Sequence, residues 1–260
     1  MYKLLFPLLA LFVIYLPAQA QQPQPQQKLI NGLDPLKPID AVLLNWENAM
    51  SKVDSLVVQC TRTTVDKTFQ KKTTYKGYAK FLKTKTGSMY ALYLQHTKRP
   101  ELYEKVICTG EILYLYAPSE KLVYVYNLKR LKGNNQANDD NLMSLLLGMK
   151  AAQAKQRYQL TYVPPRADDK YYYYVDIQPR AKSDKADFTR ARMVLIRYNF
   201  LPRQLWFEEP NGNEITWDLP AIDTKSKLTT LDFQQPRLEP GWNWRVQPVN
   251  SQPRIMRNQK

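Results

Sequence analysis

The chain has 260 residues, with 38 lysines and arginines against 23 acidic residues, which gives a formal charge of +15. A basic balance can favour nucleic acid, anionic lipid headgroups or acidic proteins, or can simply keep a β-rich surface soluble. The basic residues are scattered through the chain and form no dense tract. Together with the export signal described next, this scatter argues against a nucleic-acid partner.

The first 20 residues have the pattern of a secretory signal peptide. Lys3 gives a positive start, residues 4–16 are mostly apolar, and Ala18-Gln19-Ala20 fits a small-x-small cleavage site. We therefore expect a periplasmic or otherwise exported protein, with an uncleaved membrane anchor as the alternative. The predicted division is a signal peptide at 1–20, a Gln/Pro-rich linker at 21–38, one domain at 39–246 and a flexible basic tail at 247–260.

Hydrophobic periodicity predicts a mainly β chain with few helices. Residues 39–53 indicate an amphipathic helix that Asp40 can cap, residues 141–148 a short buried helix, and residues 150–157 a helical turn or two. The remaining apolar runs alternate as strands at meander spacing, so neighbours in sequence should pair. The fold class is thus α+β, an unclosed antiparallel half-barrel of about ten or eleven strands with its helices on the concave side. The predicted strands are 56–65, 74–82, 88–95, 102–109, a hairpin within 110–126, then 158–162, 170–177, 192–198, 203–207 and 215–217.

The hairpin at residues 110–126 is apolar on both faces. Alternation places Tyr114 and Tyr116 on one face of its first strand, and Tyr124 and Tyr126 on one face of its return strand, with aliphatic residues opposite. An antiparallel sheet usually leaves one face in water. Helices, another sheet or an apolar ligand must therefore cover the second face.

Residues that could carry catalysis are sparse. His96 is the only histidine, and because no nucleophile motif accompanies it we expect a solvated loop residue. Adjacent carboxylates such as Asp168-Asp169 fit turns or caps. Tyr171–Tyr174 could contact a ligand, although cross-strand packing is the commoner role of such rings. We predict no catalytic residue, no metal site and no cofactor.

Cys60 and Cys108 are the two cysteines. Export would permit a disulfide. In a meander, however, three steps of about 4.8 Å separate their strands, which exceeds the roughly 7 Å limit between bridged Cα atoms. We therefore expect buried free thiols.

The order of these elements resembles the LolA-like lipoprotein-carrier superfamily, including its planctomycete-type members, over roughly residues 40–245. The first helix followed by M-S-K-V-D-S-L-V-V-Q-C-T-R is similar to the family's helix and first strand, and G-Y-A-K-F to its second strand. T-G-E-I-L-Y-L-Y-A-P is similar to the family's aromatic strand and turn. N-L-M-S-L-L-L-G is similar to its mid-chain segment, and L-D-F-Q-Q-P-R-L-E-P-G-W to its closing piece.

The resemblance implies a half-barrel whose helices form a lid over an apolar cavity. It implies a non-enzymatic periplasmic carrier of acyl chains, with a lipid-modified protein or lipid as ligand and with inner- and outer-membrane partner proteins; we expect a monomer. Trp46 would belong to the lid, and Lys85 and Thr86 replace the family's lid-holding Arg, which puts that contact in doubt. The expected cavity lining is Tyr90, Leu92, Tyr114, Tyr116, Tyr124, Tyr126, Met143, Leu145 and Leu146.

Two alternatives stay open for these residues. The same side chains could serve plain core packing. In that case the chain would be a structural or protein-interaction module whose cavity is permanently filled.

Overall fold

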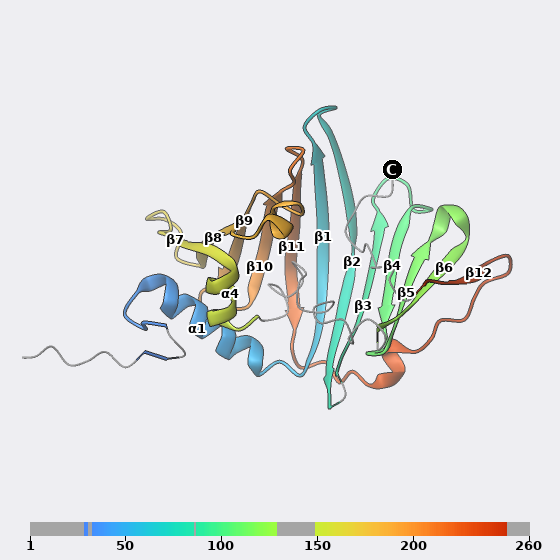
Figure 1. Ribbon diagram of the computed structural model, residues 1–260, viewed down its shortest axis with the longest axis horizontal. Coiled ribbons are helices and arrows are strands. Elements are labelled where there is room, and N and C mark those ends of the chain that lie inside the picture. Colours follow the sequence, from blue (N-terminus) through green and yellow to red (C-terminus); the bar gives the residue numbers. More distant parts are fainter. Residues whose placement is uncertain (1–28, 31–32, 86, 129–148, 249–260) are drawn as a thin grey trace, which may run out of the picture.

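The computed structural model describes residues 29–30, 33–85, 87–128 and 149–248. Its centre is one 12-stranded sheet in the order β12-β6-β5-β4-β3-β2-β1-β11-β10-β9-β8-β7. Figure 1 shows that the sheet is twisted and stays open, with β7 and β12 at its two edges. The open half-barrel predicted from the sequence is therefore confirmed.

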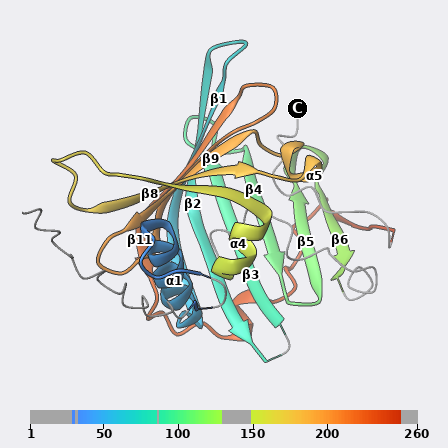
Figure 2. The same cartoon turned by 60° about the vertical axis from the view of Figure 1, so that its left-hand side comes forward.

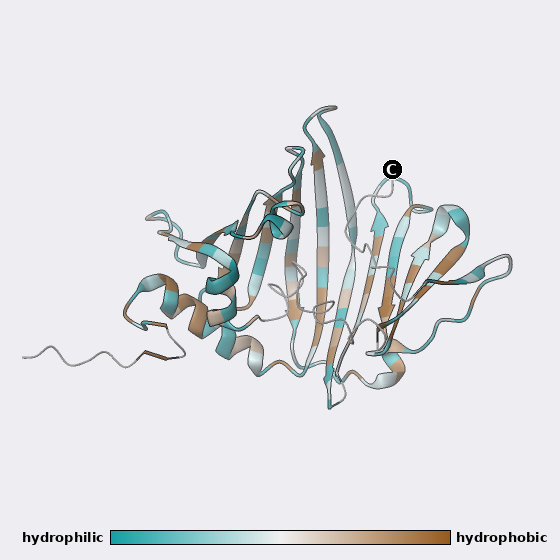
Figure 3. Cartoon of the chain, in the orientation of Figure 1, coloured by the Kyte–Doolittle hydropathy of each residue, from teal (hydrophilic) through white to brown (hydrophobic). Residues whose placement is uncertain are grey.

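Two meanders make up this sheet, and the antiparallel pair β1–β11 joins them. Figure 3 shows apolar and polar bands following one another along the long strands, as the alternation predicted. The first meander contains β1 (Ser55–Asp66), β2 (Lys71–Thr84), β3 (Gly87–His96), β4 (Tyr103–Cys108), β5 (Ile112–Ala117) and β6 (Leu122–Asn127). The second contains β7 (Tyr158–Val163), β8 (Tyr172–Pro179), β9 (Arg190–Ile196), β10 (Pro202–Glu208) and β11 (Glu214–Asp223).

The helical elements are short apart from the first. They are α1 (Pro38–Ser51), α4 (Ala151–Arg157), α5 (Lys182–Lys185) and the 3-10 turns η1 (Pro118–Glu120) and η2 (Thr230–Phe233). None of the helices in the described residues has the length and apolar character needed to cross a bilayer. The helix expected at 150–157 is confirmed as α4, whereas the one expected at 141–148 and the signal peptide at 1–20 lie outside the described residues.

The start of α1 differs from the prediction in the role of Asp40. The helix begins at Pro38, a suitable first residue because an N–H at that position would lack an intrahelical partner. Asp40 does not cap it. One carboxylate oxygen of Asp40 accepts the backbone N–H of Asp34 at 2.9 Å, and the other pairs with Lys155 of α4 at 2.6 Å. Asp40 therefore ties α1 to the preceding turn and to α4.

Helices α1 and α4 lie on one face of the sheet, which we call the inner face (Figure 2). Alternate residues of β1 from Leu56 to Thr64 are buried there. Leu43, Trp46 and Met50 of α1 are buried in the same hydrophobic cluster as the inward residues of both meanders. Apolar burial thus holds α1 to the sheet.

The C-terminal segment 224–246, which we call the strap, runs along the outer face of the first meander. Lys80 of β2 pairs with Asp232 of η2 at 2.9 Å, and Phe233 is 1% exposed. The strap ends in β12 (Asn243–Val246), which pairs in parallel with β6. This twelfth strand makes the sheet mixed rather than purely antiparallel. All four of its residues are exposed. The strand therefore has no buried face, and the hydrophobic alternation that predicts a half-buried strand does not apply to it.

The strap covers the second apolar face of the β5–β6 hairpin. The Trp244 ring lies 5.5 Å from that of Tyr114, and the Trp242 ring lies 5.6 Å from that of Tyr116. The sequence allowed helices, another sheet or a ligand as the cover. The structure uses the chain's own C-terminal segment instead.

Gly77 of β2 is required by the close approach of β3. A Cβ atom at Gly77 would lie 1.8 Å from the carbonyl oxygen of Tyr93, and backbone atoms cannot yield cheaply. We expect Gly77→Ala to lower the free energy of unfolding by about 3 kcal/mol or more in urea denaturation. Gly212→Ala is the control, because no atom lies within 4 Å and only its φ of +83° opposes a side chain, at about 1 kcal/mol. Equal losses in the two variants would contradict the steric explanation.

Candidate functional site

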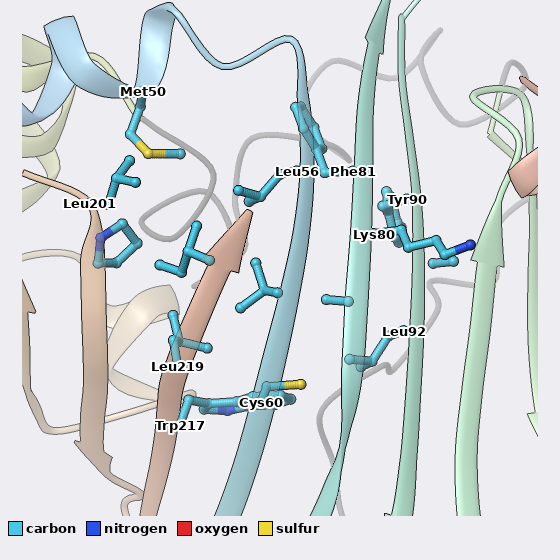
Figure 4. Close-up of a pocket in the computed structure, with 15 residues that line it drawn as sticks. Met50, Leu56, Cys60, Lys80, Phe81, Tyr90, Leu92, Leu201, Trp217 and Leu219 are labelled. Atoms are coloured by element: carbon cyan, nitrogen blue, oxygen red, sulfur yellow. The ribbon is translucent and has the colours of Figure 1, made fainter. Parts of the chain in front are cut away.

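An apolar cleft lies on the inner face where the two meanders meet. Figure 4 shows Met50 reaching down from α1 at one end and Trp217 beside Cys60 at the other, with Leu56 and Leu219 between them. The space open to the centre of a water molecule is about 60 Å³. The cleft is thus small and bounded by α1, β1, β2, β3, β10 and β11.

Among the described residues that line the cleft, Lys80 is the one with a charged side chain. Its ammonium group points away from the cleft in Figure 4 and pairs with Asp232 of the strap at 2.9 Å. Because side chains alternate along β2, the Lys80 side chain lies on the outer face, opposite to those of Ala79 and Phe81, and its charge does not enter the cleft.

The thiol and the phenol that line the cleft, those of Cys60 and Tyr90, stay neutral near pH 7. Burial raises the pKa of the Cys60 thiol to about 12. Burial, and secondly the neighbouring Cys108, raise the pKa of the Tyr90 hydroxyl well above its ordinary value. A neutral wall suits a hydrocarbon, because an unpaired charge would have to be desolvated by it.

A buried ion pair closes the inner face beyond Trp217. Arg62, which is 6% exposed, donates two hydrogen bonds to the carboxylate of Glu104, at 2.7 and 2.5 Å. The Arg62 guanidinium also lies 5.5 Å from the centroid of the Trp217 ring and 4.9 Å from that of Tyr75. The positive charge at this end of the cleft is thus neutralised and stacked between rings.

The structure divides the residues that the sequence grouped as a cavity lining. Tyr90 and Leu92 line the cleft. Tyr124 and Tyr126 belong to the inner-face cluster but do not line the cleft, whereas Tyr114 and Tyr116 lie on the outer face in a separate cluster under the strap. Met143, Leu145 and Leu146 lie outside the described residues.

The two residues that the sequence assigned to the lid, Trp46 and Lys85, lie in different environments. Trp46 is fully buried between α1 and the sheet. Lys85 is exposed in the turn between β2 and β3. The second meander supplies Leu201, Trp217 and Leu219 to the cleft, and sequence reasoning missed all three. The signal that could have found them is the pairing of β1 with β11, which no local pattern reveals.

His96 is a buried residue, which corrects the expectation of a solvated loop. It is 8% exposed, and its Nδ1 accepts the backbone N–H groups of Lys98 and Arg99 at 3.0 and 2.9 Å. Its ring packs edge-on against Tyr75 with 5.1 Å between centroids. These contacts assign it to the turn after β3. Within the described residues, His, Cys, Asp and Glu form no group of three that could hold a metal ion.

The tyrosine run at 171–174 takes part in packing rather than forming one platform. Tyr173 stacks on Phe200 with 5.3 Å between ring centroids. The hydroxyl of Tyr174 donates to Asp169, a turn residue as expected, while Tyr171 is 71% exposed.

Comparisons with known proteins find similar solved structures but no sequence relative. No protein-family model and no curated protein matches the chain. A domain from Vibrio parahaemolyticus described as an outer membrane lipoprotein-sorting protein domain is 10% identical, with 74% of this chain and 94% of that one covered and a TM-score of 0.41. An uncharacterised conserved protein from Thermus thermophilus is 8% identical, with 81% and 100% covered and a TM-score of 0.48.

A LolA superfamily protein from Nitrosomonas europaea is 12% identical, with 76% of this chain and 97% of that one covered and a TM-score of 0.35. The similar structures thus include the family that the sequence resembles. Likeness at this level carries no argument about function.

The two thiols give a test of the inner-face core. Cys60 and Cys108 form no disulfide, and they are 3% and 1% exposed. With a pKa of about 12, only a fraction on the order of 10⁻⁴ of Cys60 is thiolate at pH 8. We expect neither thiol to react with a disulfide reagent at pH 8 in the native protein, and both to react in guanidinium chloride. Rapid labelling of the native protein would contradict this packing.

The Arg62–Glu104 pair gives a second test. We expect Glu104→Gln to lower the free energy of unfolding by about 2 kcal/mol in urea, because it leaves a buried guanidinium without its counter-charge. Glu214→Gln, which breaks a more exposed pair with Lys67, should cost less than about 1 kcal/mol. A loss at Glu104 no larger than at Glu214 would show that burial adds nothing to the pair.

Proposed function

We propose that this chain is an exported, non-enzymatic binder or carrier that shelters the acyl chain of a lipid-modified protein or another amphipathic ligand. The observation that supports this proposal is the apolar inner-face cleft, which no charged side chain of its described lining enters. Tyr90 and Leu92 are the proposed contacts from the first meander, and Trp217 and Leu219 those from the second.

Burial supplies the driving force in this proposal. Each sheltered CH₂ contributes about 0.8 kcal/mol, so a 16-carbon chain gains on the order of 10 kcal/mol before ordering costs. The space of about 60 Å³ is small beside the roughly 300–1,000 Å³ of ligand pockets. Only the end of an acyl chain would therefore enter the cleft unless α1 moves away from β10 and β11.

Displacing the end of α1 from the sheet would cost little free energy if an acyl chain took its place. Met50 and its neighbours touch the sheet through apolar contacts, and an acyl chain inserted beneath them would replace one apolar contact by another. The ion pair between Asp40 and Lys155 can meanwhile keep the start of the helix in place. Such a helix would open at one end to load or release a ligand.

The proposed role as a carrier also implies which partners the chain would meet. A carrier of lipid-modified proteins needs membrane proteins that deliver and receive its cargo. The formal charge of +15 suits contact with anionic headgroups. The proposed state is a monomer, with no nucleic-acid partner and no cofactor.

The alternative is a protein-interaction or structural module whose cavity is filled by its own side chains. The small volume of the cleft favours this alternative. Trp46, which is fully buried beneath α1, is the kind of side chain that would fill such a space.

Native mass spectrometry and Trp quenching distinguish the two. A carrier should co-purify with lipid after gentle extraction, and a brominated 18-carbon fatty acid should quench the fluorescence of Trp217, with less quenching in Trp217→Phe. No bound lipid, together with no saturable quenching, would overturn the proposal and favour the filled module.

Filling the cleft should block binding without unfolding the protein. We expect Ala79→Leu, on the cleft wall, to weaken binding of the brominated fatty acid at least tenfold (about 1.4 kcal/mol or more). Ala181→Leu, the same change on an exposed residue before α5, is the matched control and should leave binding unchanged. Equal binding by both variants would place the acyl chain elsewhere.

A further inference from the structure

A second hollow lies on the outer face, between the first meander and the strap. Its space open to the centre of a water molecule is about 240 Å³, against about 60 Å³ for the inner cleft. We call it the outer hollow. Four aromatic side chains line it: Tyr93, Tyr103 and Tyr116 from the sheet, and Trp242 from the strap.

These rings continue an aromatic row that crosses neighbouring strands. The ring centroids of Tyr78 and Tyr93 are 5.8 Å apart, and those of Tyr93 and Tyr103 are 6.0 Å apart. Tyr78, at the open end of the row, is 43% exposed. A row of this kind offers ring faces to a ligand along the sheet surface.

The outer face of the second meander has a different character. There Arg192 pairs with Asp176 at 2.5 Å, and Arg190 pairs with Glu208 at 2.8 Å. Trp206 also lies on this face, but the Arg190 guanidinium lies over its ring, 5.2 Å from the centroid. The tyrosine row lies on the half of the outer face that the strap crosses.

Charged groups of both signs surround the rings of the outer hollow. The Lys105 ammonium lies 4.6 Å from the centroid of the Tyr116 ring. Arg237 and Glu239 of the strap line the opposite side. A ligand in the hollow would thus meet hydrogen-bond donors and an acceptor around an aromatic floor.

One buried polar group in the hollow lacks a partner among the described residues. Tyr116 is 8% exposed, and its hydroxyl makes no hydrogen bond to any of them. A buried hydroxyl without a partner is costly, so such groups usually meet a water molecule or a ligand. This hydroxyl belongs to a residue that lines the outer hollow.

We propose that the outer hollow binds a pyranose ring of a glycan. Aromatic faces carry negative charge density and attract the C–H groups of a sugar ring, while sugar hydroxyls can both donate and accept hydrogen bonds. That pattern matches Tyr93 and Trp242 for stacking, with Glu239, Lys105 and the Tyr116 hydroxyl for polar contacts. An acyl chain would leave the polar groups unpaired, and an isolated cation would meet Lys105 and Arg237.

This site is independent of the acyl proposal, because the two lie on opposite faces of the sheet. The test is isothermal titration calorimetry of the full mature chain with the methyl glycosides of glucose, galactose, mannose and N-acetylglucosamine. We expect at least one to bind saturably, and Trp242→Ala or Tyr93→Ala to weaken that binding at least tenfold. Tyr198→Ala removes a tyrosine that is 85% exposed on the second meander, and it should change nothing.

Tyr116→Phe keeps the test valid if the larger truncations fail to fold. Removing an unpartnered hydroxyl should leave the unfolding midpoint unchanged or raise it, while weakening glycoside binding about fivefold. Binding of the brominated fatty acid should stay the same in this variant. The proposal is overturned if no glycoside binds, or if Tyr116→Phe binds as tightly as the native chain.

Discussion

The pairing of β1 with β11 is the constraint on which the rest of the structure depends. It joins residues more than 140 positions apart, from Val57↔Asp223 to Val65↔Glu214, and merges two meanders into one sheet. Only this junction brings Cys60 and Leu56 of the first meander beside Trp217 and Leu219 of the second. The cleft and the contact of the Trp217 ring with the Arg62 guanidinium both follow from it.

Local pattern was sufficient to predict β1 to β11, α1 and α4, but not how distant elements meet. Alternation predicted β1 to β6 and the separation of Cys60 from Cys108, because neighbouring strands pair and the period of two fixes which residues share a face. It could not show that Tyr114 and Tyr116 face outward, because both faces of the hairpin are apolar. It also assigned His96 to solvent, whereas the turn after β3 folds its own backbone N–H groups onto the ring.

Each face of the sheet has apolar side chains that must be covered from water, and the two faces are covered by different elements. Inside, helix α1 covers an apolar wall and leaves a small cleft at the junction of the meanders. Outside, an extended segment covers aromatic rings and leaves a larger hollow edged by charges. Hydrocarbon and sugar differ in the same way, since one lacks hydrogen-bonding groups and the other is rich in them. The two proposed ligands therefore match the chemistry of the two faces.

The strap also covers the strand edge of β6. By pairing with β6, β12 occupies the backbone groups that would otherwise invite another chain to extend the sheet, and it places Arg245 on the new margin. Loss of the strap after a proteolytic cut between β11 and η2 would uncover the edge of β6 and the rings of Tyr114 and Tyr116 together. Loss of this one segment would thus add an uncovered, apolar strand edge and make edge-to-edge aggregation more favourable.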